Sequence, residues 1–202
     1  LAALLALAAC NVPLVPIIGL VVLGRRVHWS VWPASAGSLV GTYIMSGAEG
    51  LNFRIGDLWV ISSTVFWAVH VILVGIMASR TRAPLVVATC QFLVCGIAGL
   101  AVGFIVEGPQ AADFLGAVYG ILYVGVFSVG MAFTLQVVGQ RFTPAADAAI
   151  ILSSETVFAA LAGVVFLGEH LSTVRMTGAG LILCSILAVE LLPMLAKPRP
   201  LS

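Results

Sequence analysis

Charged residues are scarce in this chain of 202 residues. Asp, Glu, Lys and Arg make up 8% of it, against about 25% in soluble domains, whereas 61% of the residues are hydrophobic and the mean hydropathy is +1.19. A soluble fold could not bury so much apolar surface. The composition therefore excludes the soluble classes and predicts an integral membrane protein.

Residue clusters that bind nucleic acid, metals or cofactors are also missing. The net charge is +1, and the basic residues occur singly or in pairs, so nothing points to a nucleic-acid partner. The cysteines lie in apolar runs without a histidine at metal-ligand spacing, and we interpret them as packing residues with no disulfide or redox role. We expect no metal site and no cofactor. The four cysteines are Cys10, Cys90, Cys95 and Cys184.

The motifs of membrane-embedded enzymes are absent as well. A serine hydrolase needs a nucleophile and a base brought together. The chain has no Gly-x-Ser-x-Gly elbow, and of its three histidines His28 and His170 fall at loop positions while His70 falls in an apolar run. The acidic residues are scattered one by one, which disfavours a transferase that uses a metal and a diphosphate. We predict no catalytic residues and no enzyme.

About seven apolar runs are present, and a helix needs roughly 20 apolar residues to cross a bilayer. The first run lacks a basic leader and a small-residue cleavage site, so we interpret it as a span and not a signal peptide. Because position 1 is Leu, we expect a chain truncated at its N-terminus. The fold predicted is an all-α polytopic bundle. Its candidate spans are residues 1–23, 31–45, 58–77, 85–106, 114–138, 145–167 and 173–192.

Basic residues are distributed unevenly between the ends of these spans. Seven follow the first, third, fifth and seventh spans, whereas Arg54 and Arg175 lie at the opposite ends. Basic residues in short loops favour the cytoplasmic side. The bias predicts a cytoplasmic C-terminus in a multi-pass protein of the cell membrane, with the bacterial inner membrane as the expected location. The seven are Arg25, Arg26, Arg80, Arg82, Arg141, Lys197 and Arg199.

An internal repeat relates the two ends of the chain. A shift of 144 positions (168 − 24) aligns two stretches that each read helix, Leu-Gly, charged pair, helix. Chance similarity between apolar helices is the alternative explanation. The aligned pairs are Gly19 with Gly163, Val21 with Val165, Leu23 with Leu167, Gly24 with Gly168 and Leu39 with Leu183.

The turns of the two copies differ in charge, which supports an inverted repeat. The first turn carries Arg25 and Arg26, and the second carries Glu169 and His170. Five crossings separate equivalent helices, and an odd number inverts the second copy. Inverted repeats are typical of secondary transporters, whose substrate sites lie between the repeats near the midplane. A channel would need rings of charge or a carbonyl filter, and neither is evident. A membrane-embedded enzyme, a channel and a purely structural membrane protein remain the alternatives to a transporter.

The second half of the chain carries an ordered set of motifs. They are 122–128 (LYVGVFS), 131–136 (MAFTLQ), 145–151 (AADAAII), 154–161 (SETVFAAL) and 167–169 (LGE), followed by Gly178. This set resembles the second half of EamA-type transporters of the drug/metabolite transporter superfamily. The resemblance implies ten helices in two inverted five-helix repeats that move small organic solutes by alternating access, with about seven of the ten present here.

The resemblance also implies a division of the chain. Residues 1–46 would be the last two helices of the first repeat, 47–57 a connecting loop, 58–193 a complete second repeat and 194–202 a polar cytoplasmic tail. Two positions depart from the family pattern. Thr156 stands where a proline often follows the helical Glu, so we expect a less kinked helix, and the first turn is basic where the family often has Gly-Glu.

Glu155 is the leading candidate for substrate binding. An ionisable residue inside a membrane span usually faces a protein interior or a water-filled cavity. It could bind an ammonium group, carry a coupling proton or hydrogen-bond a neighbouring helix. At the 144 offset its counterpart is Asn11, which Pro13 and Pro16 follow. We predict that Asn11 and Glu155 face each other across a site between the repeats.

Three further residues are candidates for the same cavity. Trp67 and His70 share one stripe of the third span, and Gln91 lies early in the fourth. A hydrogen bond to a neighbouring helix is the structural alternative for His70 and Gln91. By contrast, we interpret Gln136 and Gln140 as solvated residues near the cytoplasmic mouth.

Small-residue spacings suit close packing of membrane helices. We interpret them as contacts inside one bundle, and the same faces would suit a homodimer. The partners expected are therefore the lipid bilayer, a small-molecule substrate such as an amino acid, amine or drug, and a second copy. The spacings are Gly37–Gly41, Gly99–Gly103 and Gly116–Gly120.

Overall fold

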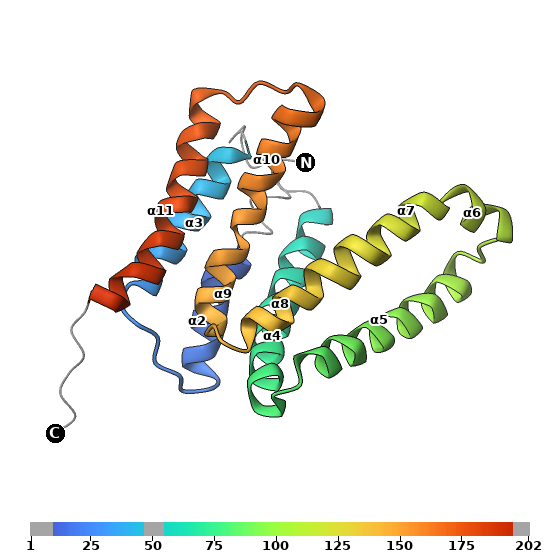
Figure 1. Cartoon of the computed structure of the whole chain (residues 1–202), viewed down its shortest axis with the longest axis horizontal. Helices are drawn as coiled ribbons and strands as arrows, with labels where there is room; N and C mark the ends of the chain where they lie inside the picture. Colours follow the sequence, from blue (N-terminus) through green and yellow to red (C-terminus); the bar gives the residue numbers. More distant parts are fainter. Residues whose placement is uncertain (1–9, 47–54, 196–202) are drawn as a thin grey trace. The chain divides into compact units, whose positions relative to one another are not determined.

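The computed structural model describes residues 10–46 and 55–195, and within these ranges every regular element is a helix (Figure 1). This confirms the all-α prediction. The elements are α2 (Asn11–Val21), α3 (Val31–Met45), α4 (Ile55–Thr81), α5 (Pro84–Val106), α6 (Ala111–Gly116), α7 (Val118–Tyr123), the π-helix η1 (Val124–Phe133), α8 (Thr134–Gln140), α9 (Ala145–Leu152), α10 (Ser154–Leu167) and α11 (Thr173–Leu195).

Five segments in the described ranges are long and apolar enough to cross a membrane, as a polytopic membrane protein requires. They are Leu58–Thr81, Pro84–Val106, Val118–Gln140, Ala145–Leu167 and Thr173–Leu195. The other two predicted spans contain shorter helices, α2 with 11 residues and α3 with 15. Residues 1–9 of the first predicted span lie outside the described part of the chain.

The chain forms two compact units. Unit 1 comprises Leu1–Ile72 and Pro144–Ser202, and unit 2 comprises Leu73–Thr143. Helix α4 continues from the first unit into the second. The limits of these units differ from the repeat boundaries inferred from the sequence, which stay a prediction.

Unit 1 contains two helical hairpins, α2–α3 and α10–α11, with the short α9 between them. Helices α3 and α11 run antiparallel, because Gly37 meets Ser185 while Gly41 meets Ile182 and Gly178. The turns of the two hairpins consequently lie at opposite ends of the unit (Figure 1). This is the relation that an inverted pair of hairpins requires. The spacing Gly37–Gly41 is thus a packing site, as predicted, because glycines let two backbones approach closely.

The two hairpin turns share one backbone geometry. Gly24 has φ +63° and Gly168 has φ +67°, a left-handed conformation that glycine adopts without strain. In each turn the next residue donates its backbone N–H to the carbonyl six positions earlier, Arg25 to Gly19 at 3.0 Å and Glu169 to Gly163 at 3.2 Å. All four positions are equivalent at the 144 offset. The repeat seen in the sequence therefore has a local structural counterpart.

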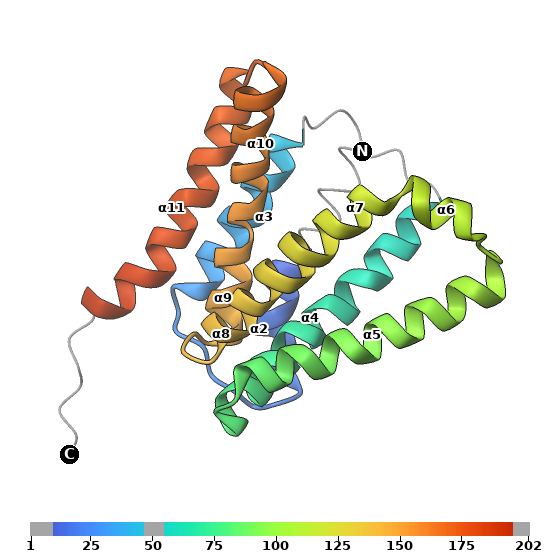
Figure 2. The ribbon, with the colours of Figure 1, turned by 45° about the vertical axis from the view of Figure 1, so that its right-hand side comes forward.

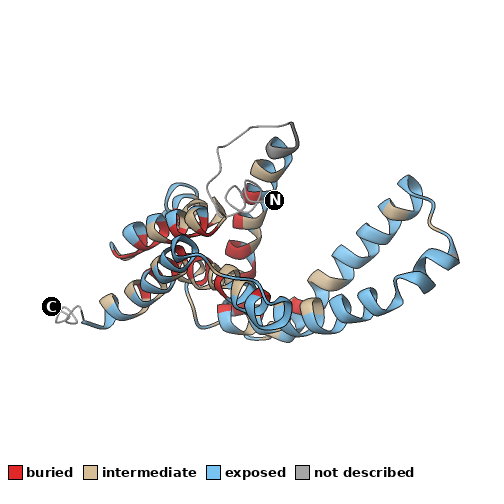
Figure 3. Cartoon of the chain, turned by 90° about the horizontal axis from the view of Figure 1, so that it is seen from above, coloured by how far each residue is buried: buried red, intermediate tan, exposed pale blue. Residues whose placement is uncertain are grey.

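Two apolar clusters hold unit 1 together. One joins α2, α3, α9 and α11, and the other joins α3, α10 and α11. In Figure 3 the buried residues gather where these helices cross. The first cluster is Val12, Val31, Ala34, Ala146, Ile150 and Val189, and the second is Met45, Val157 and Ile182.

Unit 2 has a small core at one end. It is formed by the buried residues Val74 and Ala78 near the end of α4, Ala88 near the start of α5, and Val137 of α8. Figure 2 shows where these helix segments lie. Away from this core α5, α6 and α7 are exposed almost throughout (Figure 3). Their apolar side chains suit contact with lipid tails, which are as apolar as leucine. The glycines at 99, 103, 116 and 120 meet no other described atom within 4 Å of an added Cβ, so these predicted packing sites make no contact in the described chain.

Candidate functional site

The predicted span 145–167 is interrupted at Ser153. Helix α9 ends at Leu152 and α10 begins at Ser154. The Ser153 hydroxyl donates to the carbonyl of Ile150 at 2.5 Å, and Ser38 of α3 donates to the Ser153 hydroxyl at 2.6 Å. Serine hydroxyls that bond the backbone one turn earlier bend membrane helices. The less kinked helix expected from Thr156 stays a prediction, and the structure adds an interruption three residues earlier, which a serine supplies.

Glu155 lies in the first turn of α10, immediately after this interruption. Its side chain is exposed and makes no hydrogen bond or ion pair with another residue of the described ranges. The N-terminal end of a helix dipole favours a negative charge. The carboxylate can accept hydrogen bonds, pair with a cation or hold a proton.

Asn11 opens α2 as Glu155 opens α10. It is half-buried, and its neighbour Val12 shares a core cluster with Ile150. The first turn of α2 therefore lies beside the end of α9. Glu155 follows Ile150 by five residues in the chain, beyond the interruption at Ser153. Asn11 thus lies beside α9, the helix that precedes the one carrying Glu155.

Trp67 and His70 stack on the surface of α4. Their ring centroids are 5.2 Å apart with an interplanar angle of 32°, and both side chains are half-buried. One turn earlier, Ser63 is exposed and donates to the carbonyl of Val60. One turn later, Val74 is buried. The stripe of Ser63, Trp67, His70 and Val74 thus runs along α4 from an exposed residue to a buried one.

Gln91, the fifth candidate, belongs to unit 2, whereas the other four belong to unit 1. Its side-chain oxygen is shielded and has no hydrogen-bond partner in the described chain. The same holds for the side-chain nitrogen of Gln136. A buried polar group left without a partner costs roughly 1–3 kcal/mol.

The prediction that Gln136 and Gln140 are solvated is wrong. Gln140 is 3% exposed, and Val137 between them is a core residue at 1%. Because α8 packs on α5, it turns this face inward. Sequence periodicity could not identify the inward face, since both glutamines lie close to the end of an apolar span.

Sequence reasoning missed a second group of ionisable residues. Asp147 in the first turn of α9 interacts electrostatically with Glu190 of α11 and with His28, whose Nδ1 lies 2.7 Å from the Ser30 hydroxyl. Each carboxylate interrupts an apolar run, the same signal that singled out Glu155. Within the described ranges no three His, Cys, Asp or Glu residues form a group that could hold a metal ion.

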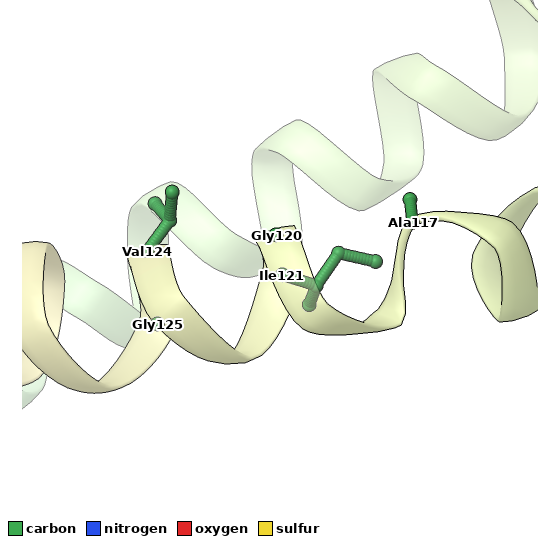
Figure 4. A pocket seen from close by; sticks show the side chains of 5 residues that line it. All are labelled: Ala117, Gly120, Ile121, Val124 and Gly125. Atoms are coloured by element: carbon green, nitrogen blue, oxygen red, sulfur yellow. The ribbon is translucent and has the colours of Figure 1, made fainter. Parts of the chain in front are cut away.

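A shallow groove of about 520 Å³ runs along α7 and the start of η1 (Figure 4). It is lined by Ala117, Gly120, Ile121, Val124 and Gly125, and none of these side chains is polar. The groove thus has no side chain that could orient a polar solute. None of the five candidate residues lines it.

Comparison with known proteins gives the family of the chain. Residues 54–191 match the EamA-like transporter family, which is more than half of the chain. The chain is 32% identical over 155 residues to a protein of Archaeoglobus fulgidus named an uncharacterized transporter, a match that covers 76% of this chain and 49% of that relative. It therefore spans about half the length of this curated relative. No solved structure matches. With five membrane-length helices and this family match, the chain belongs to the EamA-like transporter family of multi-pass membrane proteins.

Proposed function

We propose that the protein is a secondary transporter that moves a small organic solute across the cell membrane by alternating access. The observation that supports this best is the pair of inverted hairpins in unit 1, in which Asn11 and Glu155 occupy equivalent first turns. Transporter sites commonly form where interrupted helices of two inverted repeats meet near the midplane.

The proposed solute carries a hydrogen-bond donor, as an amine or an amino acid does. Glu155 would bind that donor, because its carboxylate is an acceptor without a partner among the described residues. Asn11 would supply a second polar contact, with Trp67 and His70 as further lining residues. The C-terminus would lie in the cytoplasm of the cell, which the excess of basic residues at that face supports.

The test is a thermal-unfolding screen of the purified chain with amines and amino acids, followed by uptake into proteoliposomes. A ligand that binds the folded state raises the melting temperature. We expect a hit that Glu155→Gln abolishes together with transport, at normal membrane expression.

Glu107→Gln is the matched control, since Glu107 is an exposed carboxylate at the C-terminal end of α5. It should leave both measurements unchanged. If transport and the melting shift survive in Glu155→Gln, Glu155 takes no part in the mechanism.

A further inference from the structure

Several shielded side-chain amide atoms of unit 2 lack a hydrogen-bond partner in the described chain, among them one acceptor on α5 and one donor on α8. The acceptor is the Oε1 atom of Gln91 on α5, and the donor is the Nε2 atom of Gln136 on α8. Most buried polar atoms in folded proteins have a partner, so two orphaned amide atoms on neighbouring helices call for an explanation.

The two glutamines lie at one helix interface. Helices α5 and α8 pack together through Ala88 and Val137. Gln91 follows Ala88 by three residues and so shares its face, and Gln136 directly precedes Val137. Gln91 also lies seven residues after Pro84, about 10 Å into the span. Both amides are therefore inside the membrane-spanning part of unit 2.

The helices that carry the two amides have no charged residue of their own, and Arg141 directly follows α8. The sequences of α5, η1 and α8 contain no Asp, Glu, His, Lys or Arg. A charged ligand group would have no counter-ion on these helices, and an unpaired charge inside a membrane is costly. An uncharged group that both donates and accepts would satisfy the two amides at once. A primary amide has this character.

We propose that Gln91 and Gln136 form a binding site for an uncharged amide-bearing solute. The ligand N–H donates to Oε1 of Gln91, and the ligand carbonyl accepts from Nε2 of Gln136. This ligand class differs from the amine or amino acid proposed for Glu155, so the inference goes beyond the proposed function and does not depend on it. Binding itself is measured without transport.

The test is equilibrium unfolding of the detergent-purified chain with propionamide, propylamine or propionate. These probes share a three-carbon skeleton, and at neutral pH they are neutral, cationic and anionic respectively. We expect propionamide to raise the melting temperature through Gln91 and Gln136, and any shift with propylamine or propionate to be independent of these two residues. Gln91→Leu and Gln136→Leu should each weaken its affinity about tenfold or more, since each removes one hydrogen bond from the ligand.

The melting temperature without ligand tests whether the two glutamines have a structural role instead. Replacing an orphaned buried amide by an apolar side chain should leave the ligand-free melting temperature unchanged or raised. Thr89→Val, on the exposed side of α5, is the matched control and should keep the propionamide response. If a leucine variant does not fold, Gln91→Met and Gln136→Met take its place.

Three results would overturn the inference: no propionamide shift in the wild type, a propylamine or propionate shift that depends on the two glutamines, or a propionamide shift that persists in both glutamine variants. Loss of ligand-free stability in the glutamine variants with an unchanged probe response would also overturn it. Propionamide binding in a protein that transports nothing would contradict the proposed function alone.

Discussion

At the scale of single residues, the hydroxyl of Ser153 carries much of the local structure. It accepts from Ser38 and donates to the carbonyl of Ile150, so it joins α3 to the end of α9. The neighbouring turn of α10 holds Glu155. Because Ser153 connects a neighbouring helix to the turn before Glu155, its hydrogen bonds help to fix where the carboxylate lies.

The bond between Ser38 and Ser153 should contribute modestly to stability. Hydrogen bonds between membrane helices average about 0.6 kcal/mol in double-mutant cycles. We expect Ser38→Ala to lower the free energy of unfolding by roughly that amount, up to about 1.5 kcal/mol. A double-mutant cycle with Ser153→Ala, measured by unfolding in mixed detergent, isolates the pair. Fully additive single effects would show that the two hydroxyls do not interact.

At the scale of elements, the packing of α3 on α11 depends on the absence of side chains. A Cβ at Gly41 would lie 2.8 Å from the carbonyl oxygen of Gly178, and one at Gly178 would lie 2.7 Å from that of Gly41. Backbone atoms cannot rotate out of the way as a flexible side chain can. The two helices must therefore separate if either glycine gains a side chain.

Gly41→Ala should destabilise the protein by about 1–3 kcal/mol, the usual cost of overpacking. Gly99→Ala is the matched control, because the same substitution on α5 meets nothing within 4 Å. There alanine should stabilise by about 0.5–1 kcal/mol through its higher helix propensity. Thermal unfolding should thus give shifts of opposite sign. A shift of the same sign and size at both positions would show that α3 and α11 do not pack closely.

The left-handed conformation shared by Gly24 and Gly168 leads to a further prediction. Gly24→Ala and Gly168→Ala should each cost about 1–2 kcal/mol, since a left-handed residue with a Cβ is strained. Gly180 lies in α11 without close neighbours and with an ordinary φ, so Gly180→Ala should not destabilise. Thermal unfolding of the three variants checks this. A neutral effect at Gly24 alone would argue that the two turns do not share a conformation.

Sequence periodicity predicted the regular elements better than the irregular ones. Helix α3 has the predicted bounds, and α5 begins one residue before its predicted start. Apolar runs and flanking breakers determine such limits locally. The interruption at Ser153 and the burial of Gln140 depend on neighbours distant in the chain, Ser38 in the first case and α5 in the second. The π-helix from Val124 to Phe133 has no recognisable sequence signal.

At the scale of the whole molecule, the inverted hairpins require their turns to face opposite sides of the membrane. Cysteines introduced at Arg26 and His170, in a variant without the four native cysteines, should react with a membrane-impermeant maleimide from opposite sides. The excess of basic residues predicts a cytoplasmic position for Arg26. The expected result in intact cells is labelling at position 170 and protection at 26. Labelling of both or neither would contradict the inversion.

Because α3 is synthesised long before α11, the contact between these two helices forms late. Gly41 and Gly178 are separated by 137 residues (178 − 41). At ribosomal rates of about 5–20 residues per second, α3 waits roughly 7 to 27 s for its partner to be made. Throughout that interval the hydroxyls of Ser35, Ser38 and Thr42 lack the shelter that the later helices provide. The hairpin of α2 and α3 therefore stays incompletely packed until α11 is inserted, and α11 completes the folding of an element made much earlier.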